Sequence, residues 1–573
     1  MSKQLTNKID WYLAIFLIGI ASVSYFILLW ACFRGVELTD ESFYLVGYQS
    51  GKGGILFASL FCELYDAIFG WLEISLAEVR ILRIILTISS CLLLWWGVSE
   101  KLKVTSIFNP IKWLILATIL SGSVVGFSWG PMAISYNSFV SVFLNGIVGL
   151  ALIYSNTKSI RAKSAIEFSM GVLLSFIWMV KFSSAVLIIP LVGFYWLIDN
   201  EIRIPKIVSS LRFLFWVLLG SGMAFLMVFN GFDESVESIK TLHQTIAEKM
   251  DSSYSQSTLL ENYVDDVIRL LVNNWLSLLV IFILGLAFLV KNNWRSYIFW
   301  LGFIVIGVFT FLHESWMGGN SRKYEIFTFY FLFLIGALFV GNLKKIKKDE
   351  LFLAIFLAFV PLVGAIGSSN GLTVQVLFYM PFYLLAVIIF LQRVEYRWSR
   401  VFLTTLLLTI ACLQGLTGSV LDSYRQCESL LTKDKPLESD GLFKYQLVGK
   451  DLTSLNDQLQ SLKLHKANYV FTFRHQIGVT ILLDKMPYTA DWLHEDYPDE
   501  ICRIISKRDP IDESDLLFAI PEGINNLEKV SKCLSSNGIR FPSAYEQIKE
   551  IEYYNCASRS IIKLVIFEFK TAN

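Results

Sequence analysis

Charged residues are scarce in this sequence, and their scarcity excludes most soluble architectures. Only 17% of the 573 residues are Asp, Glu, Lys or Arg, 55% are hydrophobic, and the mean hydropathy is +0.56. A soluble protein of this size needs far more polar surface to cover its core. The net charge is +1, and no basic patch is interleaved with aromatic residues, so we expect no nucleic-acid partner.

Several motifs of soluble enzymes are also missing. The sequence has no Walker loop, no glycine-rich dinucleotide fingerprint and no cysteine–histidine cluster with metal-ligand spacing. The five histidines are scattered singly, and single histidines are usually structural. The sequence therefore predicts neither a bound nucleotide nor a zinc site.

Long apolar runs make up most of the chain. Runs of about 17–21 residues are long enough to cross a hydrocarbon core of roughly 30 Å. We therefore expect an all-α polytopic membrane protein with about 13 transmembrane helices. The expected spans are residues 11–31, 80–98, 112–129, 137–155, 165–180, 183–198, 212–231, 273–290, 296–312, 325–342, 350–367, 372–391 and 400–419.

Basic residues in short loops predict the orientation. Lys158, Arg161 and Lys163 lie together between two spans, and such loops stay in the cytoplasm. The N-terminus is then cytoplasmic, and an odd number of helices puts the C-terminal part outside. The first run is too long for a signal peptide and lacks a small-residue cleavage site, so we expect a retained helix. The expected location is the bacterial inner (plasma) membrane, with a periplasmic C-terminal domain.

Residues 165–198 are too long for a single crossing. One helix of this length would measure about 50 Å. Basic flanks place both ends in the cytoplasm, so we expect two short helices with Lys181 at their outer apex. This lysine could extend its ammonium group to the membrane interface, or it could line a site on the outer side.

The predicted membrane domain, residues 1–419, carries two long outside loops. The loop at 32–79 holds an acidic stretch at 39–44, followed by apolar residues with helical spacing at 57–65, where we expect an interfacial helix. The loop at 232–272 is polar, and loops of this length usually serve as a lid or a binding element.

The remaining residues, 420–573, have ordinary charge density and short β-rich runs. The runs at 469–473, 516–520 and 561–567 predict strands, and 525–535 predicts a helix, so we expect an extracytoplasmic α/β domain. Four cysteines in this part could form one or two disulfides or remain free thiols, and the pairing does not follow from the sequence. They are Cys427, Cys502, Cys533 and Cys556.

The predicted topology brings ten polar side chains to one outer face. They are Asp40, Glu41, Glu63, Arg80, Arg83, Lys181, His313, Arg322, Lys323 and Tyr324. Carboxylates can accept a proton from a hydroxyl, while Arg and Lys can neutralise a phosphate leaving group. A site between membrane helices and an outside domain can take an amphiphilic donor from the lipid and a polar acceptor from water.

The acidic stretch carries a specific resemblance. Asp40-Glu41-x-x-Tyr44, in the first outside loop, resembles the motif of the GT-C superfamily of membrane glycosyltransferases, in particular the lipid A aminoarabinose transferases and protein O-mannosyltransferases. The stretch around Lys181 that ends at Pro190, an arginine that opens the second helix and the Arg322-Lys323-Tyr324 triplet before a late helix are similar to further features of that family. The expected layout of helices and outside domain also resembles the aminoarabinose transferases.

This resemblance implies roles for individual residues. Asp40 would act as the catalytic base or orient the acceptor, with Glu41 as its structural or charge partner. The predicted phosphate-binding residues are Lys181, Arg322, Lys323 and Arg80. The predicted acceptor- or sugar-binding residues are Tyr44, Glu63, His313 and Tyr324. No cofactor is implied with certainty, and a divalent metal ion is left open because some relatives need one and others do not.

The sequence also departs from both named branches. Phe43 stands where the aminoarabinose branch has an arginine, and Glu63 is followed by Leu64 and Tyr65 rather than by Lys-Pro-Pro. These differences favour a sister type: an inverting transferase that moves a monosaccharide from polyprenyl (undecaprenyl) phosphate to a glycan or glycolipid such as O-antigen or lipid A. The partners are then this lipid-linked donor, the acceptor and membrane lipid. The alternatives are a transporter or flippase and a non-catalytic assembly factor.

Overall fold

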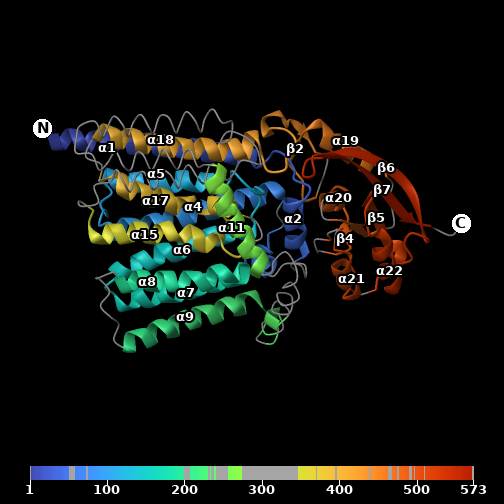
Figure 1. The fold of residues 1–573 in the computed structure, drawn as a ribbon, viewed down its shortest axis with the longest axis horizontal. Coiled ribbons are helices and arrows are strands. Elements are labelled where there is room, and N and C mark those ends of the chain that lie inside the picture. Colours follow the sequence, from blue (N-terminus) through green and yellow to red (C-terminus); the bar gives the residue numbers. More distant parts are fainter. Residues whose placement is uncertain are drawn as a thin grey trace.

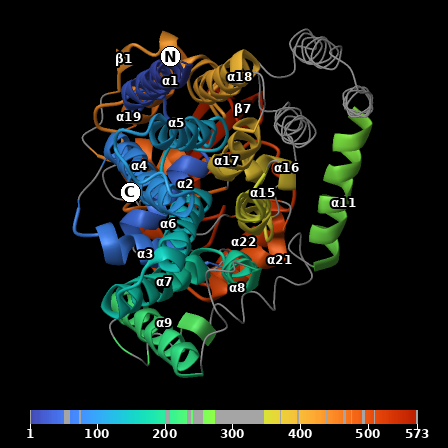
Figure 2. The ribbon, with the colours of Figure 1, turned by 90° about the vertical axis from the view of Figure 1, so that its left-hand side faces the viewer.

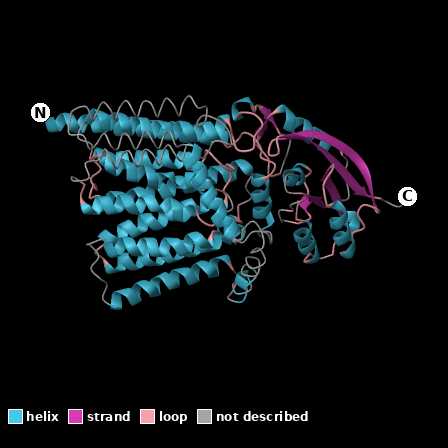
Figure 3. Ribbon diagram, in the orientation of Figure 1, coloured by secondary structure: helices cyan, strands magenta, loops and turns pink. Residues whose placement is uncertain are grey.

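The protein has two parts that lie end to end (Figure 1). The computed structural model describes residues 2–50, 59–72, 75–198, 207–229, 231, 233, 236, 238–240, 256–273, 346–368, 371–393, 397–437, 441–462, 467–473, 476–489, 493, 495, 497–508 and 510–570. Figure 3 shows helices throughout the first part and strands only in the second. The expected fold class, a helical membrane part followed by an α/β domain, is confirmed.

The first part is a bundle of long, roughly parallel helices, seen nearly end on in Figure 2. Its helices are α1 (Ser2–Ala31), α4 (Leu76–Lys101), α5 (Pro110–Val125), α6 (Tyr136–Asn156), α7 (Ile160–Val180), α8 (Phe182–Ile198), α9 (Ile207–Val228), α15 (Lys348–Ala365), α17 (Met380–Leu391) and α18 (Arg397–Leu416). A short α16 (Leu372–Gln375) and the 3-10 turn η3 (Val376–Tyr379) lead into α17.

Ten of the predicted spans coincide with these helices. The spans at 273–290, 296–312 and 325–342 lie outside the described residues. Within the described part, seven helices are long and apolar enough to cross a membrane. The protein is therefore a multi-pass membrane protein, in agreement with its hydropathy.

Small residues allow the helices to approach closely. Helices α4 and α6 meet at Gly97 and Gly149, where a Cβ atom built on Gly97 would lie 2.4 Å from the carbonyl oxygen of Gly149. Packing in a membrane depends on such close backbone contact, because lipid gives little hydrophobic drive for helix association. This crossing lies near the C-terminal end of α4, whereas Arg80 lies near its N-terminal end.

The stretch at 165–198 folds as predicted, into two helices joined at Lys181. The backbone turns between α7 and α8 at this residue. Ser59 and Leu60, which precede α3, hydrogen-bond to the last carbonyls of α7. Lys181 thus lies at the end of the bundle that carries the acidic stretch.

Three shorter helices cover this end of the bundle. They are α2 (Asp40–Ser50), α3 (Phe61–Phe69) and α11 (Gln256–Asn273). The apolar run predicted at the interface forms α3, but Phe61, Leu64 and Tyr65 pack inside the protein, because α2, α7 and α9 cover that face. The Tyr263 hydroxyl of α11 accepts hydrogen bonds from Gly367 N and Ser368 N, which anchors part of the second outside loop on the bundle.

The second part is a small α/β domain. Its five-stranded sheet has the order β4-β3-β5-β7-β6, with β3, β4 and β5 parallel and β7 antiparallel to both neighbours. The strands are β3 (Tyr469–Thr472), β4 (Met486–Pro487), β5 (Leu516–Pro521), β6 (Tyr545–Asn555) and β7 (Ser560–Phe569). The helices are α19 (Lys450–Gln460), α20 (Ile477–Leu482), α21 (Pro498–Ser506) and α22 (Leu527–Ser536). The predicted strands and helix coincide with β3, β5, β7 and α22.

The linker between the parts is firmly attached. Its two-stranded ribbon pairs β1 (Lys435–Pro436) with β2 (Leu447–Val448). One disulfide, Cys427–Cys556, ties the linker to the end of β6, and a second, Cys502–Cys533, joins α21 to α22. All four cysteines of this part are therefore paired, which resolves the alternatives that the sequence left open.

Candidate active site

The acidic stretch lies at the junction of the two parts (Figure 1). Gly35 N donates to Leu447 O at 2.8 Å, and Gly478 N, at the start of α20, donates to Leu38 O at 2.8 Å. The loop that leads into α2 is thus held by the linker and by the α/β domain. Side chains at the start of α2 therefore face both the membrane helices and the outside domain.

Asp40 is the first residue of α2 and is partly exposed. Its Oδ1 lies 2.8 Å from a guanidinium nitrogen of Arg425, and its Oδ2 accepts a hydrogen bond from the Tyr424 hydroxyl at 2.5 Å. The Asp40 side chain is 24% exposed and the Arg425 side chain 22%. A carboxylate can accept about four hydrogen bonds, so Asp40 is oriented by two donors and retains acceptor capacity.

Tyr424 and Arg425 belong to the linker that follows the last membrane helix. Burial, and then the charge of Asp40, raise the pKa of Tyr424 well above its ordinary value, so its hydroxyl remains a donor. Arg425 also donates to the hydroxyl of Thr39. The linker therefore fixes both the position and the direction of the Asp40 carboxylate.

Glu37 caps the start of α2 from inside. It is buried, and it accepts hydrogen bonds from Thr39 N at 2.9 Å and Glu41 N at 2.6 Å. Helix N-termini favour negative charge. Burial, and then the charge of Asp40, nevertheless raise the pKa of Glu37 to about 7. This carboxyl group therefore supports the backbone that carries Asp40.

Glu41 has a very different environment from its neighbour. It forms a salt bridge with Arg80 in which the two side chains are 1% and 2% exposed, and it also accepts from Ala133 N at 2.8 Å. Arg80 donates further to the carbonyls of Cys32 and Gly35. Its remaining acceptors are the carbonyl of Arg34 and the side chain of Gln446.

These contacts use every N–H group of Arg80, which leaves none for a phosphate in this conformation. Arg83, one turn further along α4, is also buried and donates to the carbonyls of Gly126 and Pro131. Both arginines thus hold loops together at this end of the bundle.

Lys181 is buried at the end of another helix. Its Nζ donates to the carbonyls of Gly364 and Ala365, at 2.7 and 3.2 Å. A lysine at these carbonyls, which α15 leaves unsatisfied at its C-terminus, is favoured by the helix dipole. Two of its three donors are thus used.

The predicted acceptor-binding residues in the described part are Tyr44 and Glu63. Tyr44 is buried, and its ring meets that of Phe61 edge to face at 5.4 Å, while Tyr48 stacks on Tyr65 at 3.7 Å. Glu63 lies half-buried on α3. An aromatic cluster therefore joins α2 to α3, one helical turn beyond Asp40. His313, Arg322, Lys323 and Tyr324 lie outside the described residues.

The described carboxylates do not form a metal site. No group of three or more His, Cys, Asp or Glu residues with suitable placement occurs among the described residues. Asp40 is held by Arg425 and Tyr424, while Glu41 is held by Arg80. These residues do not fit a divalent ion in this conformation, so no chemical step below passes through one.

Three residues of the site escaped the sequence analysis: Glu37, Tyr424 and Arg425. A usable signal was present for the last two. They follow the final predicted span on the outer side, and Cys427 comes two residues later. The predicted topology had been used to select polar residues on the outer side in the earlier loops, and the same selection would have included Tyr424 and Arg425.

Comparisons with known proteins give distant likenesses among solved structures alone. No protein-family model matches the sequence, and no curated protein matches it. Among solved structures, the Archaeoglobus fulgidus oligosaccharyltransferase, crystallised tethered by a disulfide to an acceptor peptide containing the NVT sequon, is similar with a TM-score of 0.44 and 8% sequence identity. The match covers 91% of this chain and 68% of that chain. A likeness of this degree assigns neither an activity nor a partner to the present chain.

Proposed function

We propose that this protein is an inverting glycosyltransferase that moves a monosaccharide from polyprenyl (undecaprenyl) phosphate to a cell-surface glycan or glycolipid such as O-antigen or lipid A. The reaction would take place at the periplasmic face of the bacterial inner membrane. The observation that carries the proposal is Asp40: a partly exposed carboxylate, oriented by Tyr424 and Arg425 at the junction of the membrane helices and the α/β domain. The motif around Asp40 supports it independently, through its resemblance to the GT-C superfamily.

The reaction needs one base and one stabilised leaving group. An acceptor hydroxyl attacks the anomeric carbon as its proton passes to the Asp40 carboxylate. The new bond joins the acceptor oxygen to this carbon, and the bond from the carbon to the phosphate oxygen breaks, which inverts the configuration. Polyprenyl phosphate leaves with the electron pair. Proton transfer by a positioned group typically contributes about 10²–10⁴-fold to the rate.

The donor phosphate needs cationic partners. Arg322 and Lys323 remain predicted for this role, and Lys181 retains one N–H donor beside its two carbonyl contacts. We do not assign the role to Arg80, because its five donors are satisfied within the protein. A lipid-linked donor would reach Asp40 from the bundle, and a polar acceptor would reach it past the α/β domain.

The test uses purified full-length protein, polyprenyl phosphates that carry different radiolabelled sugars, and surface-glycan acceptors. We expect Asp40→Asn to reduce transfer at least about 100-fold while folding and donor binding are preserved, because the amide cannot accept the proton. Asp457→Asn is the matched control, since Asp457 lies exposed on α19. It should leave transfer unchanged.

Two results would overturn the proposal. One is unchanged turnover in Asp40→Asn. The other is the absence of any product with folded wild-type protein across the whole panel of donors. If reconstituted vesicles then showed lipid flipping or efflux without a covalent product, the transporter hypothesis would replace it.

A further inference from the structure

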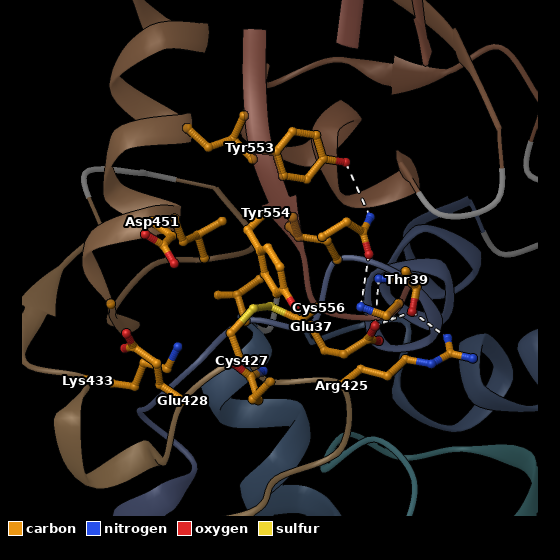
Figure 4. Close-up of a pocket in the computed structure, with 18 residues that line it drawn as sticks. Glu37, Thr39, Arg425, Cys427, Glu428, Lys433, Asp451, Tyr553, Tyr554 and Cys556 are labelled. Atoms are coloured by element: carbon orange, nitrogen blue, oxygen red, sulfur yellow. Dashed lines mark hydrogen bonds between the residues drawn. A yellow bond between two sulfur atoms is a disulfide. The ribbon is translucent and has the colours of Figure 1, made fainter. Parts of the chain in front are cut away.

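A pocket lies directly behind the Asp40 loop, between the membrane part and the α/β domain (Figure 4). It is partly open to solvent, and the space along it, open solvent included, amounts to about 590 Å³. Its walls come from four segments of the chain: the loop at 36–39, the linker at 425–433, the start of α19 and the end of β6. The Cys427–Cys556 disulfide forms part of the wall. The pocket therefore lies where the α/β domain is tied to the linker.

One wall carries a buried cation. Lys433 is only 7% exposed, and among the described residues its ammonium group has no hydrogen bond or ion pair. Glu428 and Asp451 lie on the same side of the pocket (Figure 4). Burial lowers the pKa of Lys433, and these two carboxylates act in the opposite direction. The ammonium group of Lys433 lines the pocket, where acceptor oxygens of a ligand can bond to it.

Gly449 makes room for these groups. A Cβ atom built on it would lie 2.8 Å from a carboxylate oxygen of Glu428 and 3.3 Å from Nζ of Lys433. Its backbone, with φ −85° and ψ 174°, is open to any residue. The glycine is therefore not needed by its conformation, but it keeps this wall of the pocket open.

The lining indicates the class of ligand. Tyr554 projects into the pocket and is 43% exposed, which leaves a ring face for apolar contact. Ammonium and guanidinium groups alternate with carboxylates, so both donors and acceptors face the space. A free phosphate would be repelled by Glu428 and Asp451. A sugar ring offers hydroxyl groups to both kinds of partner and a C–H face to the tyrosine.

A single side chain, that of Arg425, separates the pocket from the proposed base, Asp40. Arg425 and Thr39 line it, and Arg425 is the residue that holds Asp40. We propose that this pocket binds a saccharide unit of the acceptor glycan, adjacent to the unit whose hydroxyl reacts at Asp40. The identification of this saccharide as part of the acceptor rests on the proposed function, whereas the binding of a saccharide can be tested without catalysis.

The test combines binding and kinetics on the full chain. Wild-type protein is applied to a glycan array of neutral, amino-sugar and uronic-acid oligosaccharides, and the best oligosaccharide is then titrated. We expect Gly449→Ala, Lys433→Met and Tyr554→Ala each to weaken binding about tenfold. With that oligosaccharide as acceptor, KM should rise by a similar factor while kcat stays within about twofold. Lys532→Met and Tyr445→Ala, at exposed positions away from the pocket, should change neither quantity.

The outcomes separate this proposal from the proposed function. Tight binding to wild type that all three variants weaken supports the pocket even if no transfer is found. Wild-type protein that binds no oligosaccharide, or binding that Gly449→Ala and Tyr554→Ala leave unchanged, overturns it even if transfer depends on Asp40. Gly449→Ala keeps the test sound if Lys433→Met fails to fold.

Discussion

Two carboxylate–arginine pairs meet at the start of α2, and their environments differ sharply. Asp40 pairs with Arg425 at the edge of the junction, where the side chains are 24% and 22% exposed. Glu41 pairs with Arg80 inside the protein, where they are 1% and 2% exposed. Neighbouring residues of a helix point about 100° apart. One carboxylate therefore faces the junction and the other faces the bundle.

The two pairs differ in the hydrogen-bonding capacity that they retain. The buried pair is satisfied on all sides, and Arg80 ties Glu41 to the carbonyls of the 32–35 loop. The exposed pair retains acceptor capacity on Asp40, and its arginine comes from the linker. The same two functional groups thus form a structural clamp in one place and an oriented, partly exposed carboxylate, the proposed base, in the other.

The largest effect is expected at the buried pair. Arg80→Met leaves the Glu41 carboxylate buried without its cation, and breaking such a pair typically costs about 3–5 kcal/mol. We expect a corresponding fall in the free energy of unfolding, with low yield of folded protein. Thermal unfolding in detergent measures this fall in stability. The double variant Arg80→Met/Glu41→Gln should recover part of the lost stability, because no unpaired charge remains buried.

The opposite result would restore the role implied by the resemblance. If Arg80→Met folded normally and raised only the KM for the polyprenyl-phosphate donor, Arg80 would bind phosphate after all. Arg161→Met, in a predicted cytoplasmic loop, is the control for loss of one arginine near the bundle and should leave stability unchanged.

The exposed pair should respond in rate rather than in stability. Arg425→Gln removes the partner that orients Asp40, and a displacement of about 1 Å in a reacting group can cost about 100-fold. We expect kcat to fall about 10–100-fold, with the melting temperature nearly constant.

Conservative variants test whether Arg425 positions the base. Arg425→Lys keeps the charge and should recover part of kcat, while Tyr424→Phe removes the second donor and should cost less than Arg425→Gln. A variant Arg425→Gln with full kcat would contradict the positioning role.

The sequence revealed the helices more readily than the contacts among them. Hydropathy predicted most described spans because a membrane helix must be apolar along its length. The acidic motif and its resemblance singled out Asp40, whose catalytic role remains a prediction. The partners of Asp40, however, lie 384 and 385 positions away, and no local pattern encodes that pairing.

The hydrogen-bond partners of the cationic side chains could not be predicted from the sequence either. The resemblance to the GT-C superfamily, together with their predicted place on the outer side, implied that Arg80 and Lys181 bind phosphate. The structure places both against backbone carbonyls, at Gly35 and Gly364 among others. A cationic side chain at a helix end can either bind a phosphate or donate to unsatisfied backbone carbonyls. Only the fold distinguishes these two roles.

The smallest effect concerns Glu37, which caps the helix that bears both carboxylates. Its pKa in the folded protein, about 7, exceeds its ordinary value of 4.5. Between these values the folded state keeps a proton that the unfolded state has released, so this stabilisation is full below about pH 4.5 and is lost as pH rises through about 7. Glu37→Gln lacks this dependence.

We therefore expect the melting temperature of wild-type protein to fall relative to Glu37→Gln, by a few degrees, between pH 5 and pH 8. Glu528→Gln, on the surface of α22, should run parallel to wild type over this range. If wild type and Glu37→Gln also ran parallel, Glu37 would be ionised throughout. The donors at Thr39 and Glu41 would then outweigh burial, and the start of α2 would be held by a charge rather than by a neutral acid.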